Sequence, residues 1–109
     1  MTSEPVATTP ESFQVFNRRQ TIGVSAVHGG AINGVYLDEA VRKMGERELA
    51  REIVSVASVA AMRGRLSVRE QVEAAAKAEG RTVTPATYEA MPDVPTAEDY
   101  DRYKTTTLK

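Results

Sequence analysis

The feature that most constrains the fold is a change in the spacing of hydrophobic residues, from every second residue to every third or fourth, between residues 13 and 61. Apolar and polar residues alternate in 13–17, in 21–27 and, less regularly, in 31–37, and this alternation is typical of half-buried antiparallel strands. From Gly45 onward the apolar residues follow helical spacing instead. The sequence therefore predicts an α+β fold, a three-stranded antiparallel β-meander followed by one long amphipathic helix.

Glycines mark the turn between the second and third predicted strands and the middle of the third strand. Gly29 and Gly30 follow His28 and supply the positive φ angles that a tight hairpin turn needs. Gly34 lies in the middle of the third strand, where glycine indicates a bulge or the close approach of another backbone. The segment 38–43 fits either a helical turn or an extended loop, and the sequence leaves both open.

The predicted helix starts near Gly45. Glycine is an acceptable N-cap, and the methionine before it can pack against Leu49 inside the helix. Gly64 interrupts the helical pattern, and a capping box at 67–70 could begin a second helix there. A glycine inside a helix costs only ~1 kcal/mol relative to alanine, so we favour one largely continuous helix that stops at Gly80.

These patterns divide the chain into three parts. Residues 1–12 are rich in threonine, proline, serine and glutamate, which predicts a disordered N-terminal tail. Residues 13–80 form the α+β domain. Residues 81–109 are polar and contain three prolines, which predicts an irregular C-terminal tail in which Thr96 could cap one short helical turn.

Composition and charge limit the classes of partner. The 109 residues carry 14 basic and 15 acidic side chains, and the net charge of -1 gives no overall attraction to nucleic acid or acidic lipid. There is no cysteine, which excludes disulfides and thiol chemistry. The N-terminus lacks the features of a signal peptide, and no apolar run approaches the ~18 residues of a membrane span. We expect a cytoplasmic protein that does not insert into membranes.

Side chains suited to catalysis are few. His28 is the only histidine, and a lone histidine at a hairpin tip is a poor metal site and cannot build a catalytic triad. The acidic pairs Asp38–Glu39 and Asp99–Asp101 fall in loops or at helix ends, where solvation or helix-end electrostatics explains them. We therefore expect no catalytic residue, no metal site, no cofactor and no enzyme activity.

Basic residues occur in two connecting segments and along the predicted helix, and could bind phosphates as a strip. Glutamates interleave with them, so a solvated face of mixed charge explains them better and nucleic-acid binding is the less favoured reading. The basic residues concerned are Arg18, Arg19, Arg42, Lys43, Arg47, Arg51, Arg63, Arg65 and Arg69.

The predicted helix is longer than the predicted strands, because a helix that reaches residue 79 extends past strands of five to seven residues. We therefore expect part of its apolar stripe to contact a second copy or another chain. The expected partner or dimer interface combines the outer sheet face with the helix stripe, and consists of Phe16, Val27, Val35, Leu37, Leu49, Ile53, Val56 and Ala60.

Five segments carry a resemblance to a known group of proteins. They are Phe13–Asn17, Thr21–Val27, His28–Ile32, Val35–Leu37 and Met44–Ala57, a valine-rich hairpin with a glycine turn that leads into a Met-x-Glu-x-x-Leu-Ala-x-Glu-Ile helix start. This arrangement resembles the mycobacterial ESX-1 (type VII) secretion-associated proteins of the EspD and EspH kind, which are similar to the YbaB/EbfC-like fold. Gly45 stands where serine is usual in that group.

The resemblance implies a non-catalytic accessory or chaperone-like protein that stabilises or escorts ESX secretion substrates. It also implies a homodimer, or a heterodimer with a related protein. No tyrosine is followed four positions later by an acidic residue, so the general ESX export signal is absent and the resemblance implies a helper rather than a cargo. Two alternatives stay open: a YbaB-like nucleoid-associated DNA-binding protein, and a structural subunit of a larger assembly.

Overall fold

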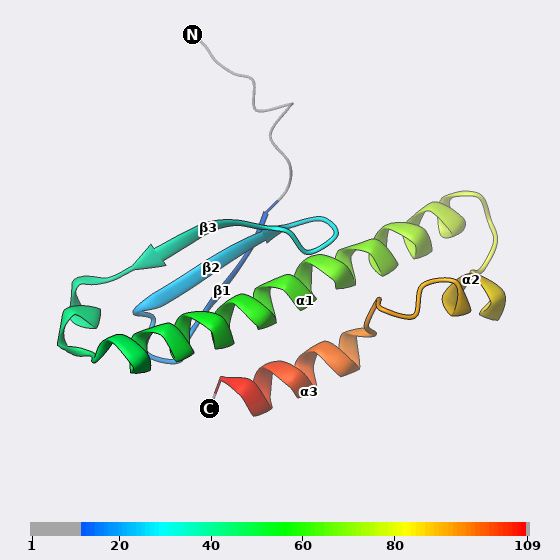
Figure 1. The fold of residues 1–109 in the computed structure, drawn as a ribbon. Coiled ribbons are helices and arrows are strands. Elements are labelled where there is room, and N and C mark those ends of the chain that lie inside the picture. The colour runs from blue at the N-terminus through cyan, green and yellow to red at the C-terminus, as the bar shows by residue number, and fades with distance from the viewer. Residues whose placement is uncertain (1–11, 109) are drawn as a thin grey trace, which may run out of the picture.

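The computed structural model describes residues 12–108, which form a three-stranded sheet packed against one long helix, with two shorter helices at the C-terminus (Figure 1). This architecture confirms the predicted α+β fold. The predicted N-terminal tail lies outside the described residues, apart from Ser12, which begins the first strand. In chain order the elements are β1 (Ser12–Phe16), β2 (Ile22–Val27), β3 (Ile32–Leu37), the 3-10 helix η2 (Glu39–Lys43), α1 (Glu46–Ala78), α2 (Pro85–Glu89) and α3 (Ala97–Thr107).

The sheet is an antiparallel meander with β2 in the centre. Val24 is paired with Val15 on one side and with Val35 on the other, and paired residues in an antiparallel ladder point to the same face. The side chains of Val15, Ile22, Val24 and Ala26 are buried on the face that packs against α1. The hydrophobic core therefore lies between this face and the helix.

The other sheet face carries an aromatic pair above a glycine. Gly23 is paired with Phe16 and with Tyr36, and the two rings lie 6.0 Å apart in an edge-to-face arrangement. A Cβ on Gly23 would lie 2.5 Å from the Phe16 ring, so the glycine leaves room for the ring to lie over the strand. This face has no helix against it among residues 12–108.

Two irregularities shape the hairpin between β2 and β3. Gly29 and Gly30 have φ angles of 94° and 105°, as the tight turn requires. Further along, Ser25 pairs with Gly34 but Ala26 pairs with Ile32, so Asn33 is an extra residue in β3. The bulge predicted around Gly34 is therefore present, one residue earlier.

Helix α1 runs without interruption from Glu46 to Ala78, with Gly45 as its N-cap. Ser67 does not begin a second helix, since its hydroxyl donates a hydrogen bond of 2.6 Å to the Gly64 carbonyl one turn back within α1. The prediction of a continuous helix is confirmed. The segment whose conformation the sequence left open folds as η2, with Asp38 accepting a hydrogen bond from the Ala40 amide at its start.

Gly64 is needed because the hairpin turn rests directly on α1. The Gly29 amide donates a hydrogen bond of 2.9 Å to the Gly64 carbonyl. A Cβ on Gly64 would lie 2.3 Å from the Val27 carbonyl oxygen and 2.8 Å from the Gly30 backbone. The glycine therefore lets helix and hairpin backbones meet with no side chain between them.

The C-terminal part is more regular than the irregular tail predicted from the sequence. Helix α3 has 11 residues, begins with a complete capping box between Thr96 and Asp99, and buries Tyr100 in the core. Arg69 of α1 holds the connection in place, because its Nε donates a hydrogen bond of 3.0 Å to the Pro95 carbonyl and its guanidinium lies 4.3 Å from the centre of the Tyr88 ring.

This packing corrects the expectation that the surplus length of α1 must contact another chain. Figure 1 shows the sheet on one side of α1 and the segment with α2 and α3 along another, and the α1–α3 contact is among the main contacts of the fold. Leu66, beyond the middle of α1, is buried in the same core as Tyr100. The chain's own C-terminal helix therefore covers part of the surface that was expected to need a partner.

The capping box of α3 makes the stability of this helix dependent on pH. Hydrogen bonds from Thr96, first from its backbone amide, hold the pKa of Asp99 below its usual value. A carboxyl group with a lowered folded-state pKa stabilises the fold fully above its unfolded pKa of ~3.9 and loses that contribution as the pH falls through the folded value. We expect amide hydrogen exchange in α3 to accelerate below about pH 4 relative to exchange in α1. Asp99→Asn should remove this part of the pH dependence, and equal pH profiles for the two proteins would contradict the assignment.

Candidate functional site

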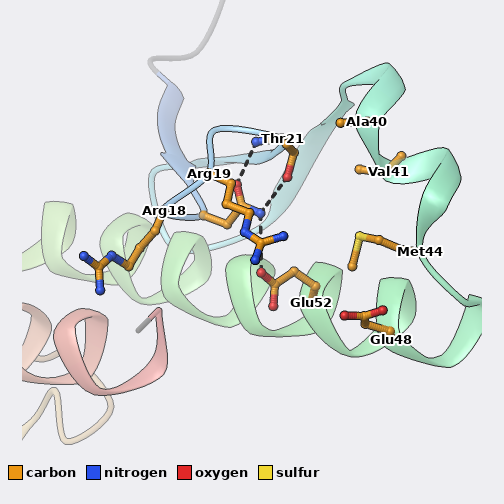
Figure 2. Close-up of a pocket in the computed structure, with 9 residues that line it drawn as sticks. Arg18, Arg19, Thr21, Ala40, Val41, Met44, Glu48 and Glu52 are labelled. Carbon is orange, nitrogen blue, oxygen red and sulfur yellow. Dashed lines mark hydrogen bonds between the residues drawn. The ribbon is translucent and has the colours of Figure 1, made fainter.

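A cavity of about 620 Å³ lies where the β1–β2 turn meets η2 and the first turns of α1 (Figure 2). This volume is within the range of small-molecule sites. Its walls carry charges of both signs, Arg18 and Arg19 from the turn and Glu48 and Glu52 from α1. In Figure 2 the Arg18 guanidinium extends away from the two glutamates.

The buried polar side chain of this cavity, Asn17, makes structural hydrogen bonds within the protein. The Asn17 side chain is almost fully buried, and its Oδ1 accepts hydrogen bonds from the amides of Thr21, at 2.8 Å, and Ile22, at 3.1 Å. Its Nδ2 donates to Thr21 Oγ1 at 2.8 Å and to Glu52 Oε2 at 3.4 Å. The amide therefore closes the β1–β2 turn and ties it to α1, and both its ends are occupied by the protein itself.

His28 and Ser67 lie within hydrogen-bond distance but do not form a nucleophile–base pair. His28 Nδ1 is 2.9 Å from Ser67 Oγ, and the hydroxyl proton of Ser67 is directed to the Gly64 carbonyl at 2.6 Å. When the Ser67 hydroxyl donates to the Gly64 carbonyl, the imidazole donates its Nδ1 proton to Ser67 Oγ, because the hydroxyl has a single proton. A base that donates to the hydroxyl cannot remove the hydroxyl proton, so the pair fastens the hairpin to α1.

Metal-ligating side chains do not gather in the described part of the chain. No group of three or more histidine, cysteine, aspartate or glutamate side chains there could hold a metal ion. In the same residues no helix is both long enough and apolar enough to cross a membrane.

Two of the arginines in the predicted basic strip are engaged within the fold. The Arg63 guanidinium lies 4.2 Å from the centre of the Phe13 ring and contacts Glu70 at 3.2 Å. Arg69 binds the Pro95 carbonyl and the Tyr88 ring and lies 3.8 Å from Glu73. Neither is free to serve as an exposed phosphate ligand while these contacts hold.

The eight residues of the predicted partner interface do not form one exposed surface in the structure. Val56 and Ala60 are fully buried in the chain's own core, and Leu49 and Ile53 are partly buried against it. These four helix residues face the sheet rather than a partner. The expectation that Val56 and Ala60 are available for a partner is therefore wrong in this structure, since the sheet already covers them.

The four strand residues of that prediction do not share one sheet face. Val35 and Leu37 pair with Val24 and Ile22, so they point to the side of α1. Phe16 pairs with Gly23, and Val27 pairs with Ser12, so these two lie on the opposite face with the aromatic pair. The prediction of a single outer face is wrong because the faces depend on the register, which the bulge at Asn33 shifts.

The structure instead leaves an apolar strip on β3, formed by Ile32, Val35 and Leu37. These residues are 43%, 53% and 45% exposed, although their side chains lie on the face that packs against α1. Helix α1 lies mainly over β2 and β1 and touches β3 little, so it does not reach them. Val54 of α1 is also exposed, at 66%.

Strand alternation alone could not have identified Ile32 as part of this strip. With strict alternation Ile32 would point away from Val35 and Leu37, because it lies three and five positions before them and side chains an odd number of positions apart point to opposite faces. The extra residue Asn33 reverses its side, and Ile32 pairs with the buried Ala26. A glycine next to an asparagine in the middle of the strand is the signal that the alternation breaks there.

Comparisons of this chain with protein-family models, with curated proteins and with solved structures found no significant match.

Proposed function

We propose that this chain is a non-catalytic, protein-binding accessory protein whose partner contacts are made by the apolar strip of β3. The observation that supports this proposal is the exposure of Ile32, Val35 and Leu37 together on an edge strand. A cluster of exposed large apolar side chains is costly to leave in water and is characteristic of interaction surfaces.

In the setting that the resemblance implies, the partners are substrates of a type VII (ESX) secretion system. The protein would act in the cytoplasm, where it stabilises or escorts a substrate before export, without a cofactor. Covering the strip during this step would keep apolar surface of both proteins out of water. The strip is also open to a second copy or a related chain, so the oligomeric state is measured together with substrate binding.

The test is titration of the purified chain with purified ESX-1 substrates by isothermal calorimetry. We expect at least one substrate to bind, with a Kd in the micromolar range or tighter, and Leu37→Asp to weaken that binding at least tenfold, because a charge would have to be desolvated in the interface. Gln14→Asp is the matched control, since Gln14 is an exposed strand residue on the other edge of the sheet. Its affinity should stay within twofold of the wild type.

Two results would overturn the proposal. One is the failure of every substrate to bind while sedimentation shows a monomer. The other is a DNA gel shift at micromolar protein that weakens steeply between two salt concentrations, because such salt dependence is the mark of phosphate contacts and would favour the nucleoid-associated alternative.

A further inference from the structure

Resting on the proposed function, we propose that the partner presents an extended peptide segment that adds to the free edge of β3 as a fourth strand. The segment would carry apolar side chains at every second position. Three features support this proposal: the open backbone groups of β3, its exposed apolar side chains and the neighbouring flank of α1.

The backbone of β3 has hydrogen-bonding groups directed at its free edge. The Asp38 amide donates to the Thr21 carbonyl at 2.8 Å, which marks this pair as hydrogen-bonded. Hydrogen-bonded pairs alternate along an antiparallel ladder, so Tyr36 is bonded to β2 while the N–H and C=O groups of Val35 and Leu37 point away from it. Within residues 12–108 no strand pairs with this edge.

The residues of β3 do nothing to block such pairing. Its sequence, INGVYL, has no charged residue and no proline, which are common means of protecting an edge strand. The bulge at Asn33 leaves the run from Gly34 to Leu37 in regular register. Val35 and Leu37 therefore offer both the open backbone groups and the exposed apolar side chains.

The flank of α1 beside β3 extends the apolar surface. Glu52 and Arg63 contact Asn17 and Phe13, so the flank that carries them faces β1. Val54 lies two residues after Glu52, about 200° around the helix, and so belongs to the opposite flank. Ala61, two turns further along the same flank, meets the β2–β3 turn, since a Cβ on Gly30 would lie 2.9 Å from the Ala61 carbonyl oxygen. Alternate side chains of an added strand would lie between the strip and this flank.

The other edge of the sheet does not offer the same site. Val15 of β1 is almost fully buried under α1, and the Arg63 guanidinium covers the ring of Phe13. The side chains that an added strand would meet on the core side of β1 are therefore already packed. Of the two sheet edges, β3 is therefore the one to which we expect the peptide to bind.

The size of the surface favours a peptide over a second copy of the chain. A stable protein–protein interface takes about 20–30 residues from each side. β3 has 6 residues, and the strip and Val54 are the large exposed hydrophobic side chains on this side of the described structure. Two copies joined edge to edge would fall short of such an interface, whereas one extended segment of similar length matches the strand and gains affinity from main-chain hydrogen bonds.

The experiment measures the fluorescence anisotropy of a labelled peptide of alternating valine and threonine with a lysine at each end. We expect saturable binding to the full chain, at least tenfold weaker for Val35→Lys and within twofold of wild type for Gln14→Lys. A peptide of the same sequence with N-methylated amides on alternate residues keeps its side chains but cannot complete the ladder, and should bind at least tenfold more weakly. Thermal melting of each variant checks that it is folded.

Each of three outcomes would overturn the peptide inference. The first is equal binding of the methylated and unmethylated peptides, or no binding of either. The second is a wild-type dimer that Val35→Lys converts to monomer, which would place a second copy on the edge. The third is tighter peptide binding after removal of residues 1–11, which would mean that the chain's own N-terminal segment occupies the edge. A secretion substrate that binds by calorimetry without sensitivity to Val35→Lys would also contradict the peptide mode, but would leave the proposed function standing.

Discussion

Gly64→Ala is expected to lower the melting temperature by roughly 10 °C, because the new Cβ would occupy space that the hairpin backbone now fills. That Cβ would lie 2.3 Å from the Val27 carbonyl oxygen and 2.8 Å from the Gly30 backbone. Backbone atoms cannot rotate away as a side chain can, so helix and hairpin must move apart. Overpacking of this kind lowers the free energy of unfolding by ~1–3 kcal/mol. Loss of the hydrogen bond from the Gly29 amide adds ~1 kcal/mol.

The greater helix propensity of alanine offsets ~1 kcal/mol of this cost. The net loss of ~2 kcal/mol corresponds to a decrease in melting temperature of roughly 10 °C, at about 4–8 °C per kcal/mol for a domain of this size. Circular dichroism during thermal unfolding measures the effect. Gly45→Ala is the matched control, since no atom lies within 4 Å of a Cβ placed there, and it should cost at most ~1 kcal/mol, because alanine is a poorer N-cap residue than glycine. A Gly64→Ala protein as stable as Gly45→Ala would show that the close approach is not rigid.

Tyr100→Ala is expected to destabilise the chain by ~3 kcal/mol or more, as truncation of a buried aromatic side chain does. Tyr100 is the buried residue of α3 and belongs to the same core cluster as Val59 and Leu66. Burial raises the pKa of its hydroxyl group, which agrees with its position away from water. Without this ring α3 loses its anchor, so one flank of α1 becomes exposed as well.

Thermal unfolding and limited proteolysis between residues 90 and 108 measure this loss. Tyr103→Ala is the matched control on the same helix, because Tyr103 is 38% exposed and contributes mainly a hydrogen bond of 2.9 Å to Ser58. Its cost should be ~1 kcal/mol. Equal costs for the two substitutions would mean that α3 is not anchored through Tyr100.

The sheet and α1 could be predicted from the sequence because their signals are local. Alternation over 21–27 identifies β2, and paired glycines at 29 and 30 identify the turn, whatever the rest of the chain does. From the sequence alone, Gly64 is consistent with either a break in the helix or a position inside a continuous one. Its actual role depends on the hairpin, which lies more than thirty residues earlier in the chain.

The faces of the sheet were less predictable because the register couples distant residues. One extra residue at Asn33 moves Ile32 to the side of Val35 and Leu37, and separates these from Phe16 and Val27. The exposed strip was predicted only in part for this reason. The sequence indicates only one short helical turn at α3 because Tyr100 is the one buried residue of this helix, and Tyr100 and Tyr103 are too few to set a hydrophobic period over its 11 residues.

Local spacing of apolar residues and the positions of glycines are therefore enough to specify which segments become strands, turn and long helix, since these depend on neighbouring residues alone. Which apolar side chains remain exposed depends instead on the register of β3 and on how α1 and α3 pack. Both are set by contacts between segments that are far apart in the chain. The candidate partner surface is a consequence of that packing.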